Sequence, residues 1–165
     1  MYVLNYKKQI ERINEMIPLR KNDKTFEVYY HDPISGKLWK SFFPRGTQSP
    51  DSPKLLRPEP LPSSLEHQLE ICLNSGELAD ATGLGIEYSL NPERWAEILS
   101  LLDSNRKRYV RSGFFEFLNN LGVKHPKQTL SALEIDLKQN SITQKEVDQL
   151  RKKAKKLWIK KFFGV

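Results

Sequence analysis

Apolar residues along this chain recur at two different periods, and each period predicts a different kind of element. Ile10, Ile13 and Ile17 are spaced three or four residues apart, as on one face of a helix. Pro18 follows directly, and a proline disfavours helical backbone in the residue before it. The pattern therefore predicts a first amphipathic helix over about residues 4 to 16.

The period changes to two between residues 26 and 43. Apolar and more polar positions alternate over residues 26–31 and again over 38–43, which is typical of strands. The stretch between them, residues 32–36 with the sequence DPISG, places a proline early in a turn and a glycine at its end. These features predict one β-hairpin over residues 26–43.

Residues 44–62 hold six of the ten prolines of the chain. Because proline has a fixed φ and no N–H, a stretch of this composition favours extended backbone. We predict an extended Pro-rich connector here. Its expected anchor is residues 55–58 with the sequence LLRP, because two adjacent leucines are poorly suited to a free linker.

From residue 63 to the end, the apolar residues return to helical spacing. A capping box is predicted at Ser63 and Glu66, and a second one at Thr143 and Glu146. Another helix begins at Asn91, which precedes a proline suited to a first helical turn. The predicted helices cover about residues 63–74, 77–89, a stretch from 91, 104–120, 127–138 and a last stretch from 143.

The chain of 165 residues, with 38% hydrophobic and 10% aromatic residues, has enough apolar material for one sizeable core. Short helices joined by short loops pack as antiparallel neighbours. We therefore predict a mainly α fold, α+β by strict count: a compact multi-helix domain of antiparallel helices preceded by one β-hairpin. The single domain, 1–165, would comprise the hairpin at 26–43, the connector at 44–62, a helical body at 63–140 and a basic C-terminal helix at 141–165.

The apolar runs are far shorter than the ~20 residues that a helix needs to cross a bilayer. The N-terminal stretch has charged side chains at Lys7, Lys8 and Glu11 and lacks the apolar core of a secretory signal. The sequence therefore predicts a cytoplasmic protein. The single cysteine, Cys72, lies among apolar residues and is predicted to be a core residue.

Residues that could carry chemistry are present but do not form a known motif. The three histidines, His31, His67 and His125, have no second ligand at a metal-binding spacing. Ser63 and Ser64 are accounted for by helix capping. We therefore predict a protein that is not an enzyme and that uses no metal or cofactor.

Two further patterns have structural interpretations. Residues 83–85, with the sequence GLG, follow no predicted strand, so we interpret them as close helix packing and not as a phosphate-binding loop. Carboxylates spaced four residues apart suit acid–base chemistry, but they are equally typical of solvated helix faces. We interpret both pairs in this chain as solvated: Glu66 with Glu70, and Glu93 with Glu97.

The strongest charge signal lies in residues 151–161, which hold seven basic and no acidic side chains. The whole chain has 27 basic and 20 acidic residues, so this stretch equals its net charge of +7. A basic helix with an apolar side is typical of phosphate-binding helices, membrane-surface helices and helices that dock on acidic proteins, and also of a solvated face. The predicted basic patch is Arg151, Lys152, Lys153, Lys155, Lys156, Lys160 and Lys161.

Three stretches, YYHDPISGKLWKSFFP, KLLRPEPLP and LEHQLEICLNSGELADATGLGIEYSLNPERWAEILSLLD, resemble parts of small immunity proteins found beside bacterial polymorphic toxins. The resemblance covers about residues 26–103. It implies a cytosolic, non-enzymatic inhibitor that occupies the active site of a toxin.

These observations predict a protein-binding module, with an immunity protein against a bacterial toxin as its particular form. Aromatic and Arg side chains at a rigid turn make good anchors for a protein partner. The predicted partner-binding residues are Tyr29, His31, Trp39, Phe43 and Arg57. The alternative is a nucleic-acid-binding protein that uses the basic C-terminal helix, and a membrane partner is the least favoured.

Overall fold

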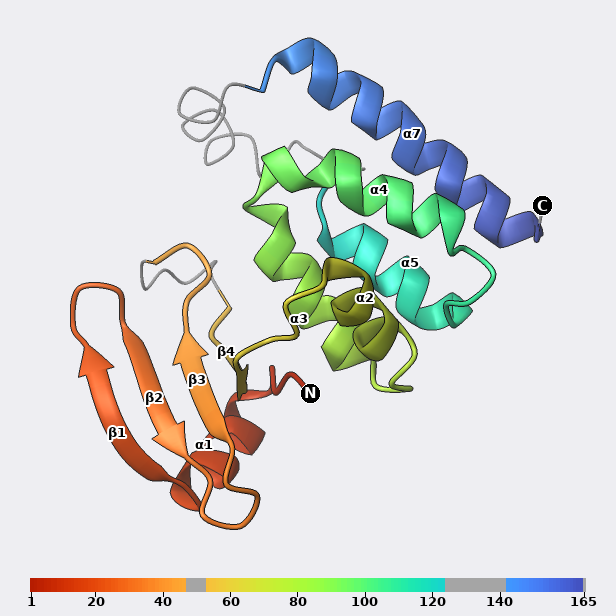
Figure 1. Ribbon diagram of the computed structural model, residues 1–165. Helices are drawn as coiled ribbons and strands as arrows, with labels where there is room; N and C mark the ends of the chain where they lie inside the picture. Colours follow the sequence, from red (N-terminus) through yellow and green to blue (C-terminus); the bar gives the residue numbers. More distant parts are fainter. Residues whose placement is uncertain (47–52, 124–141, 165) are drawn as a thin grey trace. The chain divides into compact units, whose positions relative to one another are not determined.

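The computed structural model describes residues 1–46, 53–123 and 142–164. Their contacts divide the chain into two compact units, Met1–Ser63 and Ser64–Val165, which we call unit 1 and unit 2 (Figure 1). The boundary falls where the sequence predicts the helical body to begin. The prediction of one domain over 1–165 stays a prediction, and each unit is described by itself.

Unit 1 combines one helix with an antiparallel sheet of four strands in the order β1-β2-β3-β4 (Figure 1). Its elements are α1 (Tyr6–Asn14), β1 (Ile17–Asn22), β2 (Glu27–His31), β3 (Leu38–Phe42) and β4 (Leu55–Glu59). The predicted hairpin is confirmed as β2 and β3, with Tyr30 opposite Trp39. Gly36 ends the turn with φ of +68° and donates its N–H to the Asp32 carbonyl at 2.8 Å.

Two strands were not predicted, so the sheet is larger than the hairpin. Strand β1 is exposed along its whole length and shows no alternation of buried and exposed residues. Strand β4 lies inside the predicted connector, where Pro58 sits on an edge strand, a position that proline tolerates. The predicted anchor of that connector is confirmed, because Leu55 and Leu56 are fully buried.

One core cluster of unit 1 lies on the face of the sheet that carries Tyr30 and Leu56, and the paired residues Phe42 and Leu55 are buried on the other face. Met16, Tyr30 and Leu56 form its buried centre. Partly buried side chains from α1 and the strands surround this centre, among them Ile13 and Trp39. The first predicted helix is confirmed over Tyr6–Asn14, and Met16, two residues after its end, lies in this core cluster.

Unit 2 is helical, as predicted. It contains α2 (Leu65–Leu73), α3 (Leu78–Ser89), the 3-10 turn η1 (Pro92–Arg94), α4 (Trp95–Ser104), α5 (Arg111–Asn120) and α7 (Gln144–Phe163). The N-cap of α2 is Ser64, whose hydroxyl accepts from His67 N–H, so the predicted N-cap at Ser63 is wrong by one residue, and the N3 position is His67 in place of the predicted Glu66. The predicted helix over 127–138 lies outside the described residues.

Helix α5 is shorter than predicted, because a turn precedes it over residues 105–110. The capping box of α7 is confirmed: Thr143 Oγ1 accepts from Glu146 N–H, and the Glu146 carboxylate accepts from Thr143 N–H at 2.7 Å. Thr143 thereby holds the pKa of Glu146 below its usual value.

Close backbone contacts hold unit 2 together. A Cβ added to Gly113 on α5 would lie 2.2 Å from the Leu73 carbonyl oxygen at the end of α2. One added to Gly85 on α3 would lie 2.9 Å from the Phe117 carbonyl oxygen. The interpretation of residues 83–85 as close helix packing is therefore confirmed at Gly85. Large side chains, including Trp95, Phe114 and Phe117, are fully buried around these contacts.

Together the two units confirm the predicted helix-rich, mixed fold. Among the described residues, no helix has the length and apolar character that spanning a membrane requires.

Candidate binding surfaces

The sheet of unit 1 carries a row of side chains across its four strands. Strand pairing places Arg20 opposite Tyr29, Tyr29 opposite Lys40, and Lys40 opposite Arg57. Residues that lie opposite one another in a sheet project from the same face. We call the part of this row formed by Arg20, Tyr29 and Lys40 the sheet-face triad.

The sheet-face triad is held together by cation–π contacts. The Arg20 guanidinium lies 4.1 Å from the centroid of the Tyr29 ring, and Lys40 Nζ lies 5.7 Å from the same centroid. Lys40 also forms an ion pair with Glu27 at 2.6 Å, and this contact holds the pKa of the Glu27 carboxyl below its usual value. The ring of Tyr29 therefore contacts cations from both neighbouring strands.

An open pocket of about 500 Å³ adjoins the sheet-face triad at the end of β1 and β2. Its lining is mostly charged: Arg20, Lys21, Asn22, Asp23, Lys24, Glu27 and Tyr29. Lys21 is paired with Asp23 at 2.7 Å, and Asn22 Oδ1 accepts from the N–H of Lys24 at 3.0 Å. The pocket thus offers charged side chains of both signs and a phenol ring.

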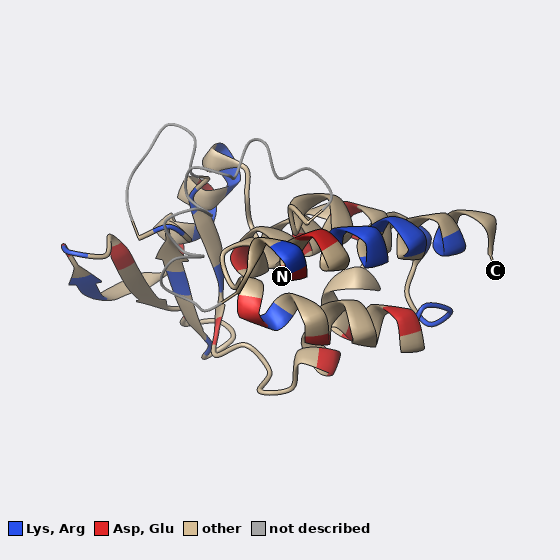
Figure 2. Cartoon of the chain, turned by 90° about the horizontal axis from the view of Figure 1, so that it is seen from above, with Lys and Arg blue, Asp and Glu red and all other residues tan. Residues whose placement is uncertain are grey.

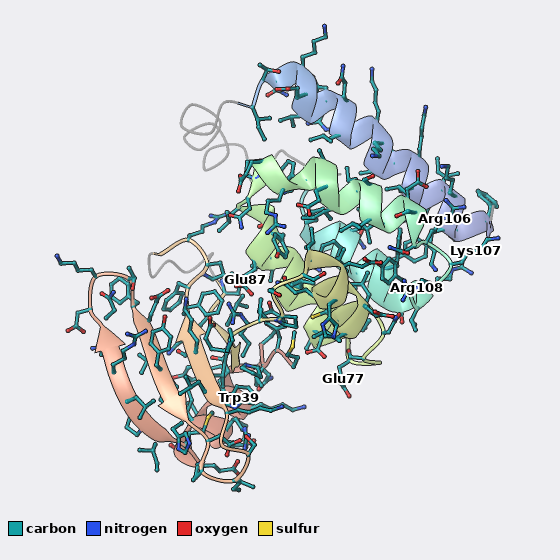
Figure 3. The ribbon with its side chains drawn as sticks, viewed as in Figure 1. Trp39, Glu77, Glu87, Arg106, Lys107 and Arg108 are labelled. Carbon is teal, nitrogen blue, oxygen red and sulfur yellow. The ribbon has the colours of Figure 1, made fainter. Side chains whose placement is uncertain are left out.

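The five predicted partner-binding residues do not form one surface. Tyr29 and His31 are two positions apart on β2 and share a face. Trp39 (Figure 3) packs instead on the core cluster of unit 1, beneath the Arg12 guanidinium at 5.0 Å. Phe43 meets Phe26 edge to face, with centroids 6.4 Å apart.

Arg57 is the clearest departure from the predicted set, because only 6% of it is exposed. Its guanidinium forms an ion pair with Glu59 and lies 5.2 Å from the Phe42 centroid. An Arg that is already paired and buried supports the strand that carries it.

Asp32 has a structural part in the hairpin turn. Its buried carboxylate accepts from Arg12 Nη2 at 2.6 Å, from Ser35 Oγ at 2.5 Å and from Ile34 N–H at 3.0 Å. The Ser35 hydroxyl is the main cause that lowers the pKa of Asp32 to about 2. The ionised carboxylate therefore ties α1 to the turn.

A second surface forms at the C-terminal end of α7 and the turn that precedes α5, near the labels for Arg106 and Lys107 in Figure 3. Lys161 Nζ donates to the carbonyl oxygens of Arg106 and Tyr109 at 2.7 and 2.6 Å. Arg111 Nη2 donates to the Phe162 carbonyl at 3.2 Å. We call this surface the basic end; its residues are Arg106, Lys107, Arg111, Lys160, Lys161, Phe162 and Phe163.

Aromatic rings run through the basic end. Trp158 stacks on Phe162 with centroids 5.3 Å apart, and Phe115 lies 5.2 Å from Trp158. Phe163 meets Phe162 edge to face at 5.1 Å, and the Arg111 guanidinium lies 4.9 Å from the Phe162 centroid. Phe162 is 44% exposed and Phe163 is 70% exposed, so the last two rings of this series face solvent.

The predicted basic patch divides into two parts. Lys152, Lys155, Lys156 and Lys160 are exposed along α7, where Figure 2 shows Lys and Arg recurring. Arg151, Lys153 and Lys161 are half-buried; Arg151 forms an ion pair with Asp148 at 3.3 Å.

Sequence reasoning missed the basic residues of the turn, although the stretch NRKRYVR over residues 105–111 carries them. Arg108 turns away from the basic end and forms an ion pair with Glu70 at 2.8 Å. Arg108 also forms an ion pair with Glu66 at 3.4 Å, so both carboxylates of the predicted solvated pair contact the same guanidinium. His67 is exposed on the helix that carries Glu66 and Glu70, and His125 lies outside the described residues.

Among the described residues, no group of three His, Cys, Asp or Glu side chains could hold a metal ion. No protein family, curated protein or solved structure matches this chain. The candidate surfaces are therefore defined by their own geometry.

Proposed function

We propose that the protein acts by binding, without catalysis, and that the sheet-face triad contacts a protein partner. The observation that carries this proposal is the Tyr29 ring held between Arg20 and Lys40. Aromatic and Arg side chains that are rigid before binding lose little entropy when a partner covers them, so they make effective anchors. The exposed cations beside the ring, Arg20, Lys21 and Lys24, favour an acidic partner surface.

The resemblance to immunity proteins gives this proposal its particular form, which is an inhibitor of a bacterial toxin in the cytoplasm. The resembling stretches include the end of β2, which supplies Tyr29, all of β3, which supplies Lys40, and all of β4. An inhibitor that covers a toxin's active site requires a stable surface and no chemistry of its own. The framework of strand pairing and ion pairs in unit 1 supports such a surface.

The test is native mass spectrometry of the untagged protein purified from its own host at low salt, before and after nuclease treatment. We expect one stoichiometric protein that survives the nuclease and is lost from a variant with Arg20→Glu and Tyr29→Ala. Ile34→Ala is the matched control, because Ile34 lies in the same hairpin and is 84% exposed. Retention of the partner by the double variant would contradict the assignment to the sheet face.

The basic end supports a second candidate function, nucleic-acid binding. Arg106 and Lys160 share the carboxylate of Asp103 at 2.9 and 3.1 Å, while Arg111 and Lys161 donate to backbone carbonyls that carry no net charge. Exposed lysines continue this positive surface along α7. If about five phosphates are neutralised, the log–log salt slope on duplex DNA should lie near −4 to −5, and a flat response would contradict it.

A further inference from the structure

The basic end places exposed aromatic rings directly beside cations. A single exposed aromatic residue is ordinary in a folded protein. Here Phe162 and Phe163 are consecutive, and Arg111 both covers the Phe162 ring and bonds the Phe162 carbonyl. The ring of Phe163 is left with most of its surface in water.

Among the residues that the structure describes, positive charge at this surface exceeds the negative charge that faces it. Asp103 is shared between Arg106 and Lys160. Burial, and then the charges of Arg106 and Arg111, lower the pKa of the Lys161 ammonium. Because these cations repel one another, an anion that lies among them would be stabilised.

We infer that the basic end binds single-stranded nucleic acid, with an unpaired base stacked on Phe163 and phosphates beside Lys107, Arg111 and Lys160. This inference rests on the second candidate function and names its substrate class. Base–aromatic stacking tolerates any base sequence, because every base has a π-face. The strand would continue along α7, where Lys152 lies about 12 Å from Lys160 at 1.5 Å per residue, a span of about three stacked nucleotides.

A duplex would contact the cations of this surface but would not stack on its aromatic rings. Its base faces are already stacked inside the helix, and exposing one costs a few kcal/mol. Cations can contact the phosphates of either form. The rings therefore favour the single strand, while the lysines favour both.

The experiment is fluorescence anisotropy of the full chain with a labelled 12-nucleotide pyrimidine-rich single strand and with a 24-base-pair duplex, both at 100 mM salt. We expect the single strand to bind at least tenfold more tightly than the duplex. Phe163→Leu should weaken single-strand binding about tenfold and leave duplex binding unchanged. Because Phe163 is so exposed, this variant should fold; Lys107→Gln, in the turn, provides a second variant that should weaken both.

Tyr6→Leu is the matched control, since Tyr6 is an aromatic residue 72% exposed on α1 in unit 1. It should change neither affinity. Equal affinities for the single strand and the duplex, unchanged by Phe163→Leu, would overturn the single-strand inference. The proposal of nucleic-acid binding would still hold in that case. Failure to bind either nucleic acid would overturn both, and binding only to vesicles of phosphatidylserine and phosphatidylcholine would assign the basic end to an anionic membrane instead.

Discussion

The sheet of unit 1 and the basic end of unit 2 both combine cations with aromatic rings, but different groups bind the cations. On the sheet, Lys40 is paired with Glu27 and Arg57 with Glu59. At the basic end, Lys161 and Arg111 are fixed by backbone carbonyls. A carbonyl positions a cation without neutralising it, so Lys161 and Arg111 keep their positive field, whereas carboxylates neutralise Lys40 and Arg57 on the sheet.

This difference separates what each surface can recognise. Binding at the sheet-face triad should depend on the shape around Tyr29 and on the exposed cations beside it, and it should respond to salt less steeply. Binding at the basic end should fall steeply with salt, because phosphate contacts release counterions. The two units also differ in what holds them: strand pairing and a small core in unit 1, and helices in backbone contact in unit 2.

The largest expected effect tests the close helix packing of unit 2. Gly113→Ala would place a methyl group 2.2 Å from the Leu73 carbonyl oxygen, and backbone must move to relieve it. We expect a loss of about 4 kcal/mol in the free energy of unfolding of unit 2. Amide hydrogen exchange, read separately over the two units, measures this.

Ser112→Ala is the control for that variant, because Ser112 is the exposed neighbour on the same helix. It should change stability by less than about 0.5 kcal/mol. If Gly113→Ala lowers hydrogen-exchange protection equally in both units, the two units unfold together. Their stabilities could then not be compared separately.

The counterpart in unit 1 is Leu56→Ala. Leu56 is fully buried at the centre of the small core with Met16 and Tyr30. Removing its side chain leaves a cavity and should cost about 3 kcal/mol, seen as faster exchange in the strands. Ile34→Ala, at an exposed position of the hairpin turn, should be neutral. A neutral Leu56→Ala would show that the core is not where the unit gains its stability.

A smaller effect is expected at the cation that docks the end of α7. Lys161→Ala removes two hydrogen bonds to the turn before α5 and should cost about 1.5 kcal/mol in the stability of unit 2. Lys156→Ala, five residues earlier on the same helix and exposed, should cost less than about 0.5 kcal/mol. Thermal unfolding of the two variants side by side measures the difference. If they are equal, Lys161 is a solvated residue like its neighbours.

The smallest expected effect is the loss of stability of unit 1 at low pH, when Asp32 is protonated. The pKa of Asp32 is lowered to about 2 by Ser35, the backbone of the turn and Arg12, so its contribution to stability is fully present above the unfolded value near 4. This contribution should be lost as the pH falls from about 4 to 2. Asp32→Asn should flatten that part of the pH profile in unit 1 and leave unit 2 unchanged. A parallel profile in the variant would show that other carboxylates dominate.

Local features of the sequence predicted several elements well. The turn between β2 and β3 and the capping box at Thr143 need only residues a few positions apart. The buried pair Leu55 and Leu56 was also predicted as an anchor. Strand β1 gave no signal, because an exposed edge strand does not require alternating residues.

The candidate surfaces were harder to predict. Arg57 had the chemistry of an anchor, but the neighbouring strand and Glu59 bury it. Trp39 was placed on the core side by the pleat of β3. Arg106 and Lys161 are far apart along the chain, so no local pattern could bring them into one surface.

The order of periods, caps and turns in the chain was sufficient to establish a helix-rich protein with a hairpin and a basic last helix. These features depend on interactions between residues close in sequence, which the unfolded chain already contains. Which cations are neutralised, and which rings remain in water, was settled by packing between distant segments. Pairing Lys40 with Glu27, and leaving Phe163 exposed beside Arg111 and Phe162, required the fold, because charge is cancelled by whatever lies within a few ångströms in space.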